Sequence, residues 1–183
     1  KMTRPSPVKI GTRKSELALY QANLVKAQLE SLGFGCELVL LSSYGDENNK
    51  KPLYEVAKLA PGVFTKALEE ALLNNQIDIA VHSLKDLATQ LPEGLRLGAV
   101  TVRESVKDCL LIHPRADSPK GPLGIKSGAT IGSSSLRRES QLISVDNKFR
   151  IKSLRGNVPT RLRKAEEGEF DAVCLAEAGL DRL

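Results

Sequence analysis

Short apolar runs typical of β-strands alternate with stretches of helical periodicity along almost the whole chain. The first helical stretch runs from Ser15, a suitable N-cap, to Leu32, and Gly33 follows it as a C-terminal stop. Strands that alternate with helices predict an α/β fold in which parallel strands are covered by helices on both faces. We expect strands at residues 8–11, 36–41, 77–81, 95–102, 109–112, 130–132, 149–153 and 171–175, and further helices at 64–74, 135–144, 158–167 and 177–183.

The strands and helices fall into two sets that meet near residues 102–107. Two such sets predict two lobes with a cleft between them, domain 1 at residues 1–102 and domain 2 at residues 103–183. The polar segment 43–61 is long for a loop inside a domain, which indicates a functional role or mobility. The chain stops one short turn into its last helix, so we expect domain 2 to be truncated at its C-terminal end.

The composition places the chain among globular proteins. Of its 183 residues, 41% are apolar and 27% are charged, which is enough to build a core. No apolar run approaches the ~18 residues of a membrane span, and no apolar stretch follows the basic N-terminus as a secretory signal requires. We therefore expect a cytoplasmic monomer with no membrane contact, and a plastid location stays open.

The three cysteines, Cys36, Cys109 and Cys174, are irregularly spaced, and the chain has only two histidines. No pair has the spacing of zinc ligands, so we expect no metal site. Each cysteine lies in an apolar, strand-like run, which indicates reduced core residues.

The net charge of +5 is unevenly distributed. Residues 137–164 carry nine basic and two acidic side chains, and six of the nine are arginine. Arginine recognises carboxylate or phosphate with a fork of donors, so this segment predicts an anionic partner, although a solvated basic face is the alternative. Single-stranded nucleic acid also needs stacking aromatic residues, and Phe149 is the only aromatic residue in the segment. A small polyanion is therefore favoured over nucleic acid.

Two turns in the second half join a predicted strand to a predicted helix and carry hydroxyls, glycine and arginine. Backbone N–H groups at the start of a helix attract anions, and ligands of α/β sheets bind where strands end. The alternative is a pair of ordinary helix caps with exposed arginines. The first turn offers Ser133, Ser135, Arg137 and Arg138, and the second offers Arg155, Gly156 and Arg161.

The first half has two comparable turns. Arg13 and Ser15 open the first helix, and Lys85 and Asp86 follow the strand predicted at 77–81. A carboxylate at Asp86 facing a basic cleft would stay ionised, and it could stabilise a cation or transfer a proton. The alternative is a surface turn in which Lys85 and Asp86 contribute little energy.

Together these stretches resemble the porphobilinogen deaminase (hydroxymethylbilane synthase) family. The resemblance implies a transferase that joins four porphobilinogen molecules head to tail into hydroxymethylbilane, with release of ammonia, in haem and chlorophyll biosynthesis. It also implies two lobes like type II periplasmic binding proteins, and a third, C-terminal domain that is absent from this chain. The matching motifs are Gly11–Ser15, Phe64–Lys66, Val81–Asp86, Gly132–Arg138, Leu154–Val158, Thr160–Arg163, Leu175–Ala176 and Ala178–Leu180.

The resemblance also assigns roles to residues. Asp86 is implied to be the catalytic residue, and Phe64 to stack over a pyrrole ring. A covalent dipyrromethane cofactor is implied, attached through a cysteine beyond residue 183, a role that none of the three cysteines here matches. The residues implied to bind the cofactor and substrate are Arg13, Ser15, Lys85, Arg103, Ser133, Ser135, Arg137, Arg138, Arg155, Gly156, Arg161 and Arg182.

The chain departs from the family pattern at three places. Leu87-Ala88 replaces Val-Pro, Ala60-Pro61-Gly62 replaces Gly-Lys-Gly, and Lys107 replaces an arginine. Loss of the proline loosens a turn, and loss of the lysine removes a basic contact. Lysine at position 107 loses the bidentate geometry of arginine. A non-catalytic, two-lobed protein that binds small polyanions is therefore kept as the alternative function, since a shared fold alone does not decide activity.

Overall fold

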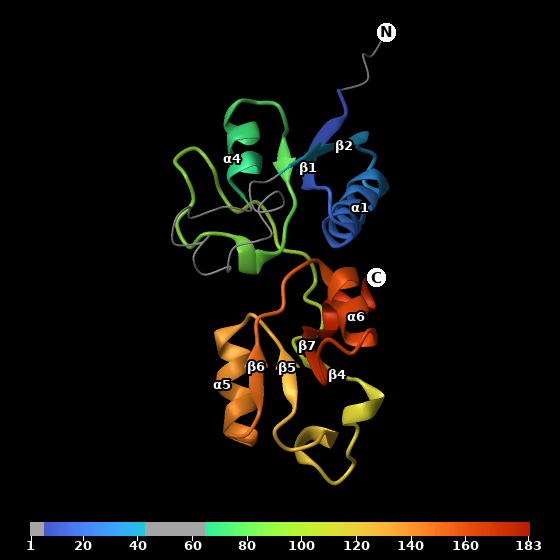
Figure 1. Cartoon of the computed structure of the whole chain (residues 1–183). Helices are drawn as coiled ribbons and strands as arrows, with labels where there is room; N and C mark the ends of the chain where they lie inside the picture. Colours follow the sequence, from blue (N-terminus) through green and yellow to red (C-terminus); the bar gives the residue numbers. More distant parts are fainter. Residues whose placement is uncertain (1–5, 43–64) are drawn as a thin grey trace. The chain divides into compact units, whose positions relative to one another are not determined.

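The computed structural model describes residues 6–42 and 65–183 (Figure 1). The chain divides into two units, Lys1–Val102 and Arg103–Leu183. Each unit has its own sheet and its own hydrophobic core. The segment 43–61 and Phe64, to which the sequence assigned functional roles, lie outside the described residues.

The first unit is built on a parallel sheet of three strands in the order β2-β1-β3. β1 pairs with β2 from Val8↔Cys36 onward and with β3 at Ile10↔Ile79. The predicted helix that starts after Ser15 is confirmed, because the Ser15 side chain accepts a hydrogen bond from the Ala18 amide. The elements are β1 (Val8–Arg13), α1 (Glu16–Ser31), β2 (Cys36–Leu41), α4 (Lys66–Leu73) and β3 (Ile79–Ala80).

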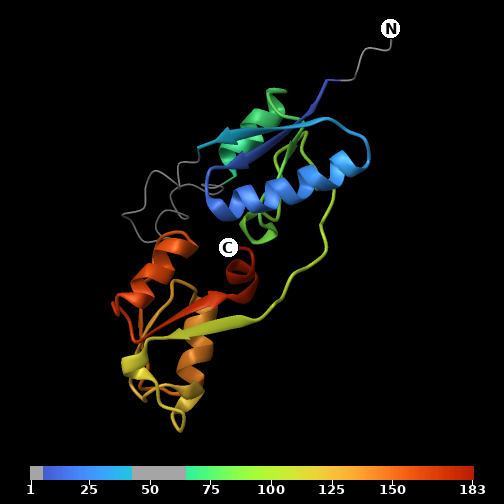
Figure 2. The ribbon, with the colours of Figure 1, turned by 90° about the vertical axis from the view of Figure 1, so that its right-hand side faces the viewer.

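The central strand β1 is packed by a helix on each face, with α1 on one side and α4 on the other (Figures 1 and 2). Thr12 is fully buried and its hydroxyl donates to the Ala18 carbonyl of α1 at 3.2 Å. Gly11, one residue earlier, faces the opposite way, and a Cβ there would run into the side chains of Ile77 and Leu68. The period of two along the strand thus sends successive residues to different helices.

The second unit has a mixed sheet in the order β4-β7-β5-β6. β5 pairs parallel with both β6 and β7, whereas β4 pairs antiparallel with β7. The elements are β4 (Asp108–Ile112), β5 (Thr130–Gly132), α5 (Leu136–Val145), β6 (Arg150–Lys152), α6 (Val158–Glu166), β7 (Ala172–Ala176) and α7 (Glu177–Asp181).

Helices α5 and α6 cover opposite faces of this sheet (Figure 1). Along β7, Ala172 and Cys174 belong to the core that includes Leu142 of α5. Val173 and Leu175 belong to the core that includes Ala165 of α6. A strand buried on both faces reads as a continuous apolar run, which is why the sequence located β7 well.

Two predictions about strands were wrong. β4 runs antiparallel rather than parallel, because the periodicity of an apolar run carries no information about its direction. Residues 95–102 have no regular secondary structure, and the apolar side chains Leu97, Val100 and Val102 are more than half exposed. No strand of the described chain pairs with this segment. The alternation of apolar and other residues in this segment therefore indicated a strand that does not form.

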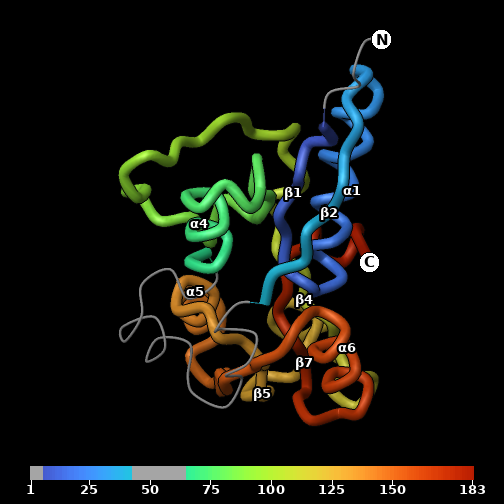
Figure 3. The backbone as a smooth tube through the Cα atoms, turned by 90° about the horizontal axis from the view of Figure 1, so that it is seen from above, coloured from blue at the N-terminus to red at the C-terminus, as the bar shows by residue number. Residues whose placement is uncertain are grey.

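The path of β1, α1 and β2 can be followed in Figure 3, where the helix runs beside the two strands it connects. Within residues 6–42 and 65–183, no helix combines the length and the apolar character that crossing a bilayer demands.

Candidate functional site

The carboxyl ends of the first sheet bring together the residues predicted from the first half. Arg13 is the last residue of β1, and Ser15 caps the following helix. β3 runs parallel to β1, and the Val81 amide donates to the Gly11 carbonyl at 3.0 Å. Residues that follow β3 therefore lie at the same edge as Arg13 and Ser15.

Asp86 closes a short 3₁₀ turn at that edge, Leu84–Asp86 (η1). Its amide donates to the Ser83 carbonyl at 3.0 Å, and the Ser83 hydroxyl donates to Gln21 Oε1 of α1 at 3.1 Å. This second bond ties the turn to the helix. Asp86 is half-buried and Lys85 is exposed, so the carboxylate is held on a braced turn while the ammonium extends into solvent.

In the second unit, the serines after β5 cap α5. Ser135 accepts a hydrogen bond from the Arg138 amide at 3.4 Å, and the buried Ser133 hydroxyl accepts one from the Ser135 amide at 3.2 Å. The structure thus confirms that Ser135 caps α5, and the anion-binding role of this turn stays a prediction. Ser134, which the sequence did not single out, donates to the Leu154 carbonyl at 2.7 Å and accepts from the Leu154 amide at 3.0 Å. Ser134 thus joins the ends of β5 and β6. In the sequence, only the run of three serines pointed to it.

The turn after β6 requires glycine. Gly156 has a φ of +110°, and a Cβ there would lie 2.7 Å from Thr160 Cγ2. Asn157 caps α6 by accepting from the Thr160 amide at 3.0 Å. The Gly156 carbonyl also accepts from Arg161 Nε at 2.8 Å, so the turn directs that side chain back over the strand ends.

Three arginines predicted to bind an anion are electrostatically close in the structure. Burial lowers the pKa of Arg161, and the positive charges of Arg138 and Arg155 lower it further. Each positive charge raises the free energy of the others, because all three are held near one another and partly out of water. A bound carboxylate or phosphate would relieve this repulsion.

Arg137 and Arg138 both form ion pairs with Asp108, the first residue of β4. Burial alone would raise the pKa of Asp108, but the hydrogen bonds from Arg138 and Arg137 outweigh it, so the pKa lies below the ordinary value. The Arg138 side chain is only 15% exposed, and in the described structure its buried Nε has no hydrogen-bond partner. The sequence analysis assigned no role to Asp108.

The remaining predicted arginines differ in their surroundings. Arg182 follows α7, its side chain is 15% exposed, and its NH2 atom lies 3.7 Å from Glu104 Oε1. Its Nε is buried and lacks a hydrogen-bond partner among the described residues. Arg103 is exposed, in the irregular segment that opens the second unit. The carboxyl edge of the second sheet therefore gathers Ser133, Ser135, Arg137, Arg138, Arg155, Gly156, Arg161 and Arg182.

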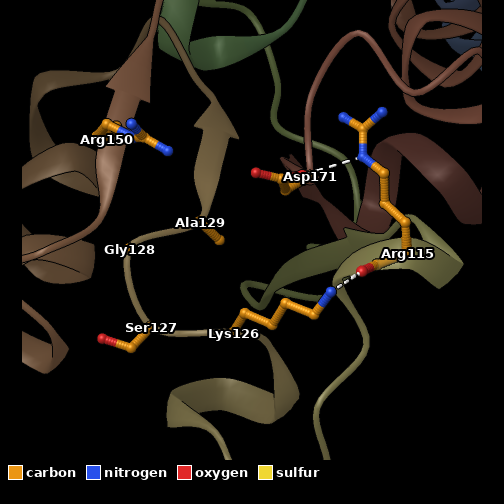
Figure 4. Close-up of a pocket in the computed structure, with 7 residues that line it drawn as sticks. All are labelled: Arg115, Lys126, Ser127, Gly128, Ala129, Arg150 and Asp171. Atoms are coloured by element: carbon orange, nitrogen blue, oxygen red, sulfur yellow. Dashed lines mark hydrogen bonds and ion pairs between the residues drawn. The ribbon is translucent and has the colours of Figure 1, made fainter.

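A basic pocket of about 350 Å³ lies at the opposite, amino edge of the same sheet (Figure 4). Its carboxylate is Asp171, whose oxygens accept from Arg115 Nε at 3.1 Å and from the Thr130 amide at 2.8 Å. The Thr130 hydrogen bond lowers the pKa of Asp171 most, and the ion pair with Arg115 adds to it against the effect of burial. Lys126 donates to the Arg115 carbonyl, and Arg150 extends toward Asp171 from the other side. Asp171 therefore links the first residue of β5 to Arg115 at this edge of the sheet.

The cysteines follow the positions of their strands in the two sheets. Cys174 on the interior strand β7 is buried, as predicted, and burial raises the pKa of its thiol. Cys36 and Cys109 are only half-buried, because β2 and β4 are edge strands. The prediction of core positions was therefore too strong for these two. No cluster of three or more metal-ligating side chains occurs in the part of the chain that the structure describes.

Residues 8–183 match the family model described as porphobilinogen deaminase, dipyromethane cofactor binding domain. A porphobilinogen deaminase of Nitratiruptor sp. is 49% identical over 177 residues, which cover 95% of this chain and 54% of the relative. Those of Geobacter metallireducens and Campylobacter concisus are 45% and 46% identical, covering 98% and 96% of this chain and 55% and 56% of the relatives. The chain thus spans about half the length of the curated relatives it matches.

Proposed function

Because this chain belongs to the porphobilinogen deaminase family, we propose that it supplies the binding and catalytic residues of an enzyme that links four porphobilinogen molecules head to tail and releases ammonia. The observation that carries the proposal is the group of arginines at the carboxyl edge of the second sheet, where burial, and then the positive charges of Arg138 and Arg155, lower the pKa of Arg161. Each pyrrole of the product bears an acetate and a propionate, so the growing chain is a polycarboxylate that such a group would bind.

The same residues fit the dipyrromethane cofactor for which the matching family model is described. When bound, this group is the primer to which pyrrole units are added. Arg138, Arg155 and Arg161 would hold its carboxylates through charge-assisted hydrogen bonds. Arg103, Arg137 and Arg182, with the Ser133 and Ser135 turn and the backbone at Gly156, would contact the remaining carboxylates. Its covalent attachment is assigned to a cysteine beyond residue 183.

Asp86 is proposed as the catalytic carboxylate. Loss of ammonia from porphobilinogen leaves a cationic methylene-pyrrole, and a fixed carboxylate lowers the energy of a developing cation. The support is local geometry, since Asp86 sits on a turn tied to α1 through Ser83 and Gln21. Arg13, Ser15 and Lys85 at the same sheet edge would receive substrate carboxylates, and Phe64 would stack on a pyrrole ring.

The proposed architecture is two domains, residues 1–102 and 103–183, each resembling a lobe of a type II periplasmic binding protein. Its support is that the proposed binding residues of each unit lie where parallel strands end, the usual ligand edge of α/β sheets. We further propose that the protein works as a monomer in the cytoplasm, its compared relatives being bacterial, with the plastid as the other compartment. The curated relatives carry the name of an enzyme, and no comparison favours the non-catalytic polyanion-binding alternative.

The first test is the denatured intact mass of the complete gene product. We expect a mass larger than that of the translated polypeptide by two pyrrole units, the size of a covalent dipyrromethane. A mass equal to the translated polypeptide, from a protein that also fails to consume porphobilinogen, would overturn the proposed function.

The second test concerns Asp86. In the complete protein, Asp86→Asn should lower ammonia release at least about a thousandfold, as expected when a group that stabilises developing charge is neutralised. The cofactor should remain attached, because Asp86 is not proposed to hold it. Turnover near that of the wild type would remove the catalytic role of Asp86 without affecting the family assignment.

A further inference from the structure

Arg137 and Arg138 converge on one carboxylate although they are neighbours on a helix. Successive residues of an α-helix point about 100° apart, so their side chains would diverge unless something drew them together. Asp108 does so with one oxygen for each arginine: Oδ1 accepts from Arg138 NH2 at 2.7 Å, and Oδ2 accepts from Arg137 NH2 at 3.0 Å. Gln141 holds Arg137 from the other side, accepting from its NH1 at 2.8 Å.

The antiparallel direction of β4 is what puts Asp108 there. Asp108 is the first residue of β4 and pairs with Ala176, the last residue of β7. An antiparallel strand thus begins where its parallel neighbours end. A parallel β4 would bring Ile112 to this edge and leave the two arginines without their carboxylate. The feature that the sequence did not predict is therefore the one that completes the arginine arrangement.

The ion pairs of Asp108 also offset the positive charge at this edge of the sheet. Arg138 is largely buried and adds to the positive charge that acts on Arg161. A buried guanidinium with no counter-charge is costly, so Asp108 offsets part of the repulsion when no ligand is bound. Asp108 takes one N–H donor of each arginine, Gln141 takes a second from Arg137, and the Cys174 carbonyl takes a second from Arg138, whereas a guanidinium carries five. Donors therefore remain for a ligand.

We propose that Asp108 is a positioning residue of the anion site, which fixes the guanidiniums of Arg137 and Arg138 before a ligand carboxylate arrives. It does not touch the ligand or the reacting atoms. The proposal rests on the proposed function, because the ligand carboxylates are those of the dipyrromethane cofactor, the substrate and the growing pyrrole chain. The opposing arrangement, in which Asp108 competes with the ligand for the arginines, predicts the opposite change in affinity.

The test is Asp108→Asn in the complete holoenzyme, with KM and kcat measured for porphobilinogen. Asparagine keeps the shape but loses the negative charge and one of the two acceptor oxygens, so we expect KM to rise about tenfold while kcat changes less than about threefold. Asp108→Glu keeps the charge with a longer side chain and should give an intermediate KM. An unchanged KM in the asparagine variant overturns the proposal. A lower KM does so too, because it would mean that the added net positive charge outweighs alignment.

Asp171→Asn is the matched control, since Asp171 is also ion-paired to an arginine in the same sheet but at its other edge. It should lower the melting temperature as Asp108→Asn does and leave KM unchanged. A KM rise of the same size in both variants would mean that the effect is structural, and would overturn the positioning role. If Asp108→Asn does not fold, Asp108→Glu decides alone, and a wild-type KM in that variant overturns the proposal.

Binding of citrate, a small polycarboxylate, separates this proposal from the proposed function. Calorimetry on the same proteins reads the anion site without turnover, and we expect weaker binding in Asp108→Asn than in the wild type or Asp171→Asn. If the wild-type protein does not convert porphobilinogen, the proposed function fails while the citrate result still tests Asp108. Equal citrate affinity in all three proteins would overturn the positioning role.

Discussion

The two edges of the second sheet carry the same chemical pair, an aspartate bound to arginine, in opposite settings. At the amino edge, Asp171 is satisfied by one arginine and by the backbone amide of Thr130, and the nearby Arg150 is exposed to solvent. At the carboxyl edge, Asp108 is shared by two arginines, and one of them adds to the charge that lowers the pKa of the half-buried Arg161.

The two edges differ in burial more than in the number of positive charges, and this difference supports the proposal that the carboxyl edge binds the ligand. Water screens exposed cations, so a basic pocket such as the one in Figure 4 can be stable without an anion. Water does not screen a partly desolvated group of arginines in this way, so such a group gains more free energy from binding an anion. The predictions below test this contrast in order of expected effect.

The largest effect is expected from Arg161. Replacing it by methionine removes a desolvated cation from the carboxyl edge, and the loss of such a charge-assisted contact costs about 2–5 kcal/mol of ligand interaction. We expect turnover of porphobilinogen by the complete enzyme to fall at least about thirtyfold. Steady-state kinetics and intact mass together would report whether activity, cofactor retention or both are lost.

Arg163→Met is the control for that experiment. Arg163 lies two residues further along α6, its side chain is 65% exposed, and it forms a long ion pair of 3.7 Å with Glu167. Surface ion pairs of this kind contribute about 0–1 kcal/mol, so turnover should stay within about twofold of the wild type. Equal losses from Arg161→Met and Arg163→Met would break the distinction between buried and exposed arginines.

A smaller effect, on stability rather than activity, is expected at the amino edge. Asp171→Asn keeps an acceptor for the Thr130 amide but loses the charge that binds Arg115. Hydrogen bonds to charged groups contribute about 1.5–3 kcal/mol, and partial exposure of this pair places the expected loss near the lower end. Urea unfolding would measure this loss of stability. An unchanged free energy of unfolding would mean that the hydrogen bonds of Asp171 do not stabilise the sheet.

The helix caps and the basic character of the second unit could be predicted from the sequence, because their local signals are strong. Ser15, Ser135 and Asn157 sit before helical runs and cap them in the structure. The clustering of arginine between residues 137 and 164 pointed to an anionic partner. Caps and charge clusters depend on residues close together in the chain, which sequence reasoning handles well.

What could not be anticipated depends on contacts between distant segments. Asp108 lies 30 residues before Arg138, and only the antiparallel register of β4 brings them together. The exposed run at 95–102 has the alternation of a strand but no partner strand in the described structure, and the alternation gives no sign of this. Strand direction and pairing follow from global packing, which a single sequence does not display.

Acid should reduce the stability that the aspartates at both edges of the second sheet give to the fold. The folded-state pKa values of Asp108 and Asp171 lie below 3.8, the ordinary value for an aspartate and the one expected in the unfolded chain, so each carboxylate stabilises the fold above that pH. That stability is lost as the pH falls through the lower, folded-state values. Unfolding measured between about pH 5 and pH 2 should show the decline, and a double variant, Asp108→Asn with Asp171→Asn, should show a shallower one. An unaltered slope would mean that other carboxylates carry the acid sensitivity.

The smallest effect is expected from Arg150→Ala, and it tests the contrast most directly. Arg150 belongs to the basic pocket and its charge helps to lower the pKa of Asp171, but it is exposed and forms no ion pair among those of the described residues. Its removal should change the free energy of unfolding by less than about 0.5 kcal/mol, as for most surface substitutions. KM should not change either, because the proposed ligand site is at the carboxyl edge. A clear rise in KM would place a substrate contact in the pocket of Figure 4, and exposed cations would then count as ligand-binding groups beside the buried ones.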